Sequence, residues 1–164
     1  MNIRSRLISF LIVLFLGLCV SAPAALAKDD GTPEGVVKAF AHQYFMLDEK
    51  MAGHMSREAL YTEHDVNRVD LLFRVKEQEA FKRGLELNYL RMRPILMKTQ
   101  VVSEDDDSAV IEFSAVMVRS INPIYRMVGY VFGMMKEHDF ETTVTVIKED
   151  GIWKVGPGGF AFPA

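Results

Sequence analysis

The hydrophobic pattern of the chain changes its period near Pro94, and this change most limits the folds available to it. Before Pro94, apolar residues recur at the spacing of α-helices, and Thr32-Pro33-Glu34 forms a strong helix start. We expect helices at about 33–48, 56–61 and 66–83, with Asp65 as the cap of the third. Beyond Pro94 apolar and β-branched residues dominate, which favours strands. Helices followed by strands are typical of an α+β fold.

The strand-forming half contains two hairpin signals. The acidic run at 104–107 separates predicted strands at 95–102 and 108–119, and Glu149-Asp150-Gly151 separates predicted strands at 139–148 and 152–155. Short turns of this kind join antiparallel neighbours. We therefore expect a curved antiparallel sheet of about four strands, with the helices packed on one face.

The first 27 residues have the pattern of an export signal. Arg4 and Arg6 precede an apolar run at 7–20, and Ala25-Leu26-Ala27 supplies the small residues of a signal-peptidase site. The apolar run has about 14 residues, whereas a membrane-spanning helix needs about 20. We expect cleavage, export to the periplasm or beyond the cell, and a single domain at 28–164. The chain would then contact the membrane only through its signal segment, before that segment is cleaved.

Two other interpretations of this start stay open. Cys19 could be lipidated, although Leu18 before it is a poor match for a lipoprotein signal. The apolar run could also remain as an uncleaved anchor, although Pro23 and the small residues after it favour cleavage.

Cleavage would change the composition in a way that excludes several functions. It removes the only cysteine and two of the 19 basic residues but none of the 22 acidic ones, which leaves a net charge of −5. A chain without thiols forms no disulfide, no cysteine zinc site and no thiol nucleophile. A net negative charge argues against a nucleic-acid partner.

Several of these segments together resemble the nuclear transport factor 2-like superfamily, with its SnoaL-like and ketosteroid-isomerase-like members. They are Thr32-Pro33-Glu34, the apolar positions at 36–40 and the closing hairpin at 148–155. The resemblance implies a cone in which a curved sheet wraps round a long first helix and encloses a pocket. Members use such a pocket for isomerase, dehydratase or epoxide hydrolase chemistry, for ligand binding or for protein association, so the fold alone does not select a function.

The segment at 122–137 departs from that family, and we expect an inserted apolar helix or lid there. Asn122-Pro123 is a good helix start, and the apolar residues that follow have helical spacing. A strand competes, because 128–132 is also β-favourable and two glycines weaken a helix. The segment would cover the pocket or form a contact, such as that of a homodimer. The residues that we assign to this lid or contact are Ile124, Val128, Gly129, Phe132 and Gly133.

The ligand-pocket candidates come from the first helix, the two sides of the third helix and one strand. On the strand at 108–119, alternate apolar residues should face the helices, and Arg119 has the same parity, so its guanidinium would be placed to meet an anionic group. His64-Asp65 is the most suggestive acid–base pair, although a solvated histidine beside a capping aspartate explains it as well. The candidates are Tyr44, His64, Tyr89, Phe113, Met117 and Arg119.

Nothing else in the sequence indicates chemistry. The four histidines, His42, His54, His64 and His138, are scattered, so we expect no metal and no cofactor, and copper binding near Met51, His54 and Met55 is a minor alternative. The motifs of nucleophile elbows and phosphate loops are absent, and Gly156-Pro157-Gly158-Gly159 should be a flexible tail. The favoured hypothesis is an exported non-catalytic protein that binds a small apolar or amphipathic ligand or a protein partner. A pocket isomerase or dehydratase and an assembly factor using 121–138 are the alternatives.

Overall fold

A computed structural model of the 164-residue chain describes residues 31–119, 128–129, 131–133 and 136–163. The export signal expected at 1–27 lies outside the described residues. The helical elements are α2 (Pro33–Phe45), η1 (Glu49–His54), α3 (Arg57–Leu60), α4 (Arg68–Lys82) and η2 (Leu87–Leu90). The strands are β1 (Met92–Glu104), β2 (Ser108–Arg119), β3 (Glu137–Glu149) and β4 (Ile152–Val155).

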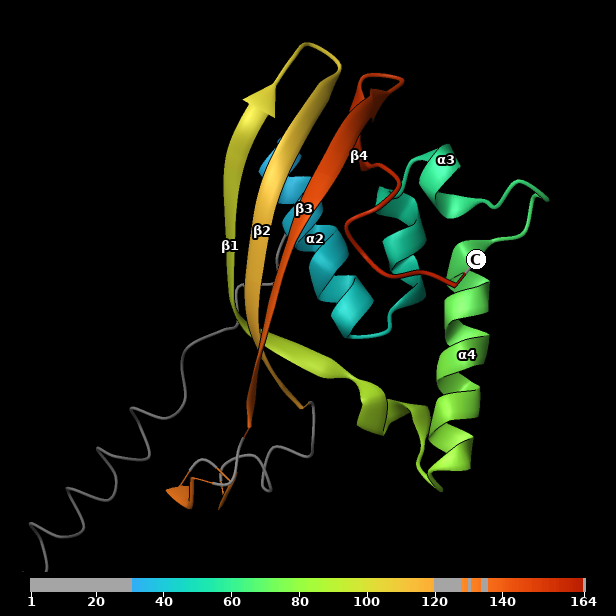
Figure 1. The fold of residues 1–164 in the computed structure, drawn as a ribbon, viewed down its shortest axis with the longest axis vertical. Coiled ribbons are helices and arrows are strands. Elements are labelled where there is room, and N and C mark those ends of the chain that lie inside the picture. The colour runs from blue at the N-terminus through green and yellow to red at the C-terminus, as the bar shows by residue number, and fades with distance from the viewer. Residues whose placement is uncertain (1–30, 120–127, 130, 134–135, 164) are drawn as a thin grey trace, which may run out of the picture.

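The strands form one open antiparallel sheet in the order β1-β2-β3-β4. The sheet is curved, α2 packs against one of its faces, and α3 and α4 lie on the same side at a greater distance (Figure 1). The α+β class and the antiparallel sheet of four strands are therefore confirmed. Helices on one face of the sheet leave the other face to solvent, and this arrangement explains the alternating burial along β2.

The helix α2 is the centre of the core because most of its surface is covered. The Thr32 hydroxyl accepts a hydrogen bond from the Gly35 amide at 3.0 Å and so caps the helix. Val36, Val37 and Phe40 have no solvent exposure. They pack against the inward residues of the sheet, which include Ala109, Ile111, Phe113, Ala115, Met117, Val144 and Val146.

Two boundaries differ from the expectation for physical reasons. Asn67, and not Asp65, caps α4, because its Oδ1 accepts from the amides of Val69 and Asp70 at 2.8 and 3.4 Å. Asp65 instead lies in the turn before the helix with φ of +59°. Pro94 falls inside β1 and does not precede it, which is tolerated because β1 is an edge strand.

The expectation of a flexible tail after β4 is wrong. Residues 156–163, which we call the C-terminal segment, fold back over α2, and Phe160 is only 6% exposed. The Gly156 amide donates to the Thr145 carbonyl at 2.8 Å, and the Thr142 hydroxyl donates to the Gly159 carbonyl at 2.7 Å. The C-terminal segment is thus part of the folded structure.

Candidate functional site

A pocket of about 220 Å³, whose surface is about equally polar and apolar, lies between α2, α3, the start of α4 and the C-terminal segment. Four separate parts of the sequence meet there, so the pocket depends on the whole tertiary fold. Its side-chain lining is apolar with one exception, the guanidinium of Arg68. The apolar side chains are Phe40, Met55, Ala59, Val155, Pro157, Phe160, Ala161 and Phe162, and Gly156 and Gly158 complete the wall.

The wall formed by the C-terminal segment is anchored by aromatic packing. The Phe160 ring meets the rings of Phe40 at 4.9 Å and of Tyr44 at 5.1 Å, both edge-on, and stacks on Phe140 at 5.5 Å between centroids. Such pairs add to the free energy gained by burying the rings. Because Phe160 packs among these three rings, Phe162, two residues further along the chain, is held at the pocket.

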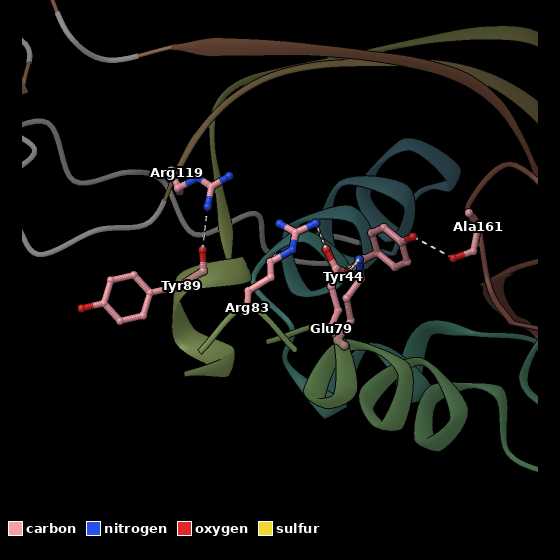
Figure 2. Close-up of polar contacts among 7 residues, drawn as sticks. Tyr44, Glu79, Arg83, Tyr89, Arg119 and Ala161 are labelled. Carbon is pink, nitrogen blue, oxygen red and sulfur yellow. Dashed lines mark hydrogen bonds and ion pairs between the residues drawn. The ribbon is translucent and has the colours of Figure 1, made fainter. Parts of the chain in front are cut away.

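Two polar contacts fix the same wall. The Tyr44 hydroxyl donates to the Ala161 carbonyl at 2.8 Å, which Figure 2 shows. Gly159 has φ of +78°, and a Cβ added there would lie 2.9 Å from the Thr143 carbonyl oxygen. Only glycine permits this combination of backbone conformation and close approach to β3. Tyr44 and Gly159 therefore position the wall without lining the pocket.

Arg68 reaches the pocket from the first position of α4. Its Nε donates to the Tyr61 carbonyl at 3.4 Å, and the residue is half-buried. In the described part of the chain Arg68 makes no ion pair. A pocket that combines apolar side chains with a guanidinium outside any ion pair has the chemistry to receive an amphipathic anion, and Arg68 is a residue that the sequence reasoning missed. The alternating Phe160 and Phe162 in a glycine-rich tail were the signal that would have located the wall.

The predicted pocket residues fall into separate groups. Tyr44 and Phe113 both contact Phe160, Phe113 at 5.8 Å between ring centroids, so they lie behind the wall of the pocket. Met117 is buried on the same face of β2 as Phe113. His64 is exposed in the turn before α4, where its amide donates to the Thr62 hydroxyl at 3.3 Å.

Tyr89 and Arg119 come together, as Figure 2 shows, but not at this pocket. Arg119 donates from Nη1 to the Tyr89 carbonyl at 3.5 Å, and both residues are exposed, Tyr89 by 50%. Neither residue lines the pocket of about 220 Å³. Arg68, which lines the pocket, is thus better placed than Arg119 to contact an anionic group there.

The segment expected as a lid or contact is described only in part. Ile124 lies outside the described residues. Val128 and Gly129 are helical, and the Phe132 amide donates to the Val128 carbonyl at 3.0 Å, which makes one helical turn. The Phe132 side chain is 71% exposed, and Gly133 has φ of +63°.

The titratable groups of the described residues offer no second site of comparable quality. His42 on α2 is half-buried, and burial followed by the positive charge of Arg93 lowers its pKa, which Asp48 opposes. Among the described residues, no three His, Cys, Asp or Glu side chains are grouped to hold a metal ion. No helix in the described ranges is long and apolar enough to cross a membrane.

A larger depression of about 840 Å³ has the character of a solvated surface. Its lining is mainly polar and includes charges of both signs, Lys38 and Lys98 with Glu112 and Glu141. Charges of both signs at an exposed surface interact only weakly. The smaller pocket at the C-terminal segment is therefore the candidate site.

Comparison with known proteins does not assign the chain to a family. No family model matches it, and no curated protein matches it. Among solved structures, it is similar to the solution structure of a SEC-C motif containing protein from Rhodopseudomonas palustris. That similarity has 18% identity, covers 80% of this chain and 79% of that one, and has a TM-score of 0.40, which is too low to carry an argument.

Membership of the nuclear transport factor 2-like superfamily is therefore wrong as a prediction. No family model matches the chain, that of this superfamily included. The prediction failed because it depended on a proline-led helix start and a tight closing hairpin, which are local features common to many α+β folds.

Proposed function

We propose that the chain is an exported, non-catalytic protein that binds one small apolar or amphipathic molecule in the pocket at the C-terminal segment. The observation that carries the proposal is the lining, eight apolar side chains with one guanidinium around about 220 Å³. An engineered apolar cavity of about 150 Å³ in another protein binds benzene. A pocket of this size therefore suits one substituted ring or an aliphatic chain of similar bulk.

The same lining favours binding over catalysis. Acid–base catalysis needs a group that exchanges protons near neutral pH, and arginine stays protonated throughout that range. Of the described residues that line the pocket, Arg68 alone is charged, and the lining contains no histidine or carboxylate. Burial of a ring in such a site supports a dissociation constant in the range of roughly micromolar to millimolar once the cost of association is included.

Binding is tested with indole, a small neutral aromatic probe, on isotope-labelled protein. We expect saturable shifts of the amide resonances of Ala59, Ala161 and Phe162. The variant Ala59→Leu should bind at least tenfold more weakly, because the added side chain fills the pocket. Glu58→Leu is the matched control, because Glu58 is exposed on the same helix. No saturable shift, or an equal affinity of Ala59→Leu with its fold intact by circular dichroism, would show that the pocket is not a binding site.

Export is tested separately by the mass of the protein recovered outside the cytoplasm. Cleavage after Ala27 predicts a chain that starts at Lys28. Recovery of the full-length chain only, inside the cell, would contradict this part of the proposal.

A further inference from the structure

We propose that Arg68 selects the ligand of this pocket, and that the ligand is a small monocarboxylate whose apolar body enters the pocket while its carboxylate meets the guanidinium. The inference rests on the proposed binding function and names the chemical class that the site prefers.

The position of Arg68 carries the first step. The residue is half-buried and borders a pocket whose other side chains are apolar. A bound molecule therefore meets apolar side chains, polar backbone atoms of the C-terminal segment and, at one point, a positive charge. A ligand that matches both features has an apolar body and one anionic end.

The hydrogen bonds of Arg68 carry the second step. The Arg68 Nε donates a hydrogen bond to the Tyr61 carbonyl oxygen at 3.4 Å. This bond fixes the end of the guanidinium that is nearer the main chain. Within the described part of the chain, the two terminal nitrogens of Arg68 make no hydrogen bond and no ion pair. A planar fork held at Nε can present paired N–H donors to one carboxylate, which is the geometry that arginine binds best.

Comparison with other described arginines shows that the absence of an ion pair is common and that the pocket position distinguishes Arg68. Arg83 on the same helix pairs with Glu79 at 2.7 Å, and Figure 2 shows that pair. Arg119 donates to the Tyr89 carbonyl. Arg74 is exposed on α4 and lies outside the pocket lining. Arg68 thus combines a pocket position with a free charge, and Arg74 supplies a matched control.

The start of α4 adds to the positive field at the site. Arg68 is the first residue of this 15-residue helix, whose amino-terminal end carries a partial positive charge. Asp70 in the same turn is the opposing charge, but it is exposed and does not line the pocket. The electrostatic balance at the pocket therefore favours an anion.

The experiment compares phenylacetate with phenylacetamide, which has nearly the same shape without the charge, by calorimetry at pH 7 and low salt. We expect wild-type protein to bind phenylacetate at least tenfold more tightly. Arg68→Gln should remove this preference while keeping the affinity for phenylacetamide, and that retained affinity also shows that the variant is folded. Arg68→Lys keeps the charge without the fork and should keep only part of the preference. Arg74→Gln makes the same change of net charge and should keep the whole preference.

The outcomes separate this inference from the proposed function. Equal affinities of wild-type protein for the two probes would overturn the role of Arg68 and leave the binding site standing. An equal loss in Arg68→Gln and Arg74→Gln would also overturn it, because the preference would then arise from net charge. Binding of neither phenylacetate, phenylacetamide nor indole would overturn the proposed function itself.

Discussion

Tyr44 and Ala161 are 117 positions apart in the chain, and a hydrogen bond of 2.8 Å joins the Tyr44 hydroxyl to the Ala161 carbonyl. This bond ties the carboxyl-terminal end of the core helix α2 to the outer part of the C-terminal segment. The Tyr44 ring also packs on Phe160 and Phe162 at 5.1 and 5.5 Å between centroids. The pocket wall is thus held by one side chain through both its ring and its hydroxyl.

Removal of the hydroxyl alone isolates the polar part of this contact. We expect Tyr44→Phe to lower the free energy of unfolding by about 0.5–1.5 kcal/mol, since the ring packing stays and one hydrogen bond is lost. Amides of the C-terminal segment should exchange faster with deuterium, because local opening becomes cheaper. Urea unfolding and hydrogen exchange measure the two effects. Tyr89→Phe, at an exposed position, is the control, and an equal loss there would contradict the role of Tyr44.

Burial also makes this contact dependent on pH at the alkaline end. Desolvation raises the pKa of Tyr44 above its usual value of 10.0, so the folded protein keeps the proton that the unfolded chain releases. The contribution of Tyr44 to stability is therefore complete below pH 10 and is lost as the pH rises beyond it. Wild-type protein should lose stability across this range more steeply than Tyr44→Phe. Parallel pH profiles of the two proteins would contradict this expectation.

Gly158 and Gly159 allow a controlled test of the close approach of the pocket wall to β3, because they share a backbone conformation and differ in their distance from β3. Both have positive φ, +86° and +78°, so alanine is strained at either position. A Cβ at Gly159 would lie 2.9 Å from the Thr143 carbonyl oxygen, whereas a Cβ at Gly158 has no atom within 4 Å. We expect Gly159→Ala to be more destabilising than Gly158→Ala by about 1–3 kcal/mol, the usual cost of overpacking. Equal melting temperatures would show that the wall does not press on β3.

The sequence predicted the elements whose signals are local. The start of α2 at Pro33, the strand Ser108–Arg119 and the last strand Ile152–Val155 all agree with the patterns of capping, alternation and tight turns. Each of these signals is complete within a few residues, because it depends on backbone hydrogen bonds and on side chains close in sequence.

The candidate site was not predictable in the same way, because it depends on contacts between distant segments. The run Gly156-Pro157-Gly158-Gly159 after Val155 predicts a flexible segment, because glycine and proline interrupt the regular backbone hydrogen bonding of helices and strands. The burial of Phe160 against α2 and β3 reverses that expectation through packing that no local pattern records. Arg68 was missed for the same reason, since the first turn of a helix gives no sign of the tail that reaches it.

A final prediction concerns His42, whose environment favours the neutral imidazole. Burial is the larger cause of its lowered pKa, the positive charge of Arg93 is the second, and the carboxylate of Asp48 acts in the opposite direction. The unfolded chain, with a histidine pKa near 6.5, then takes up a proton more readily than the folded protein does. Stability from this residue is therefore present above pH 6.5 and is lost as the pH falls through the lower folded pKa.

Two variants test this account of His42. His42→Gln should flatten the fall of unfolding free energy below pH 6.5, while His64→Gln, at an exposed turn position, should leave it unchanged. Arg93→Gln should raise the pKa of His42 only part of the way toward 6.5, because burial is the larger cause and remains. Titration of the imidazole resonances by nuclear magnetic resonance measures each value. Complete restoration to 6.5 in Arg93→Gln would mean that charge, and not burial, keeps His42 neutral.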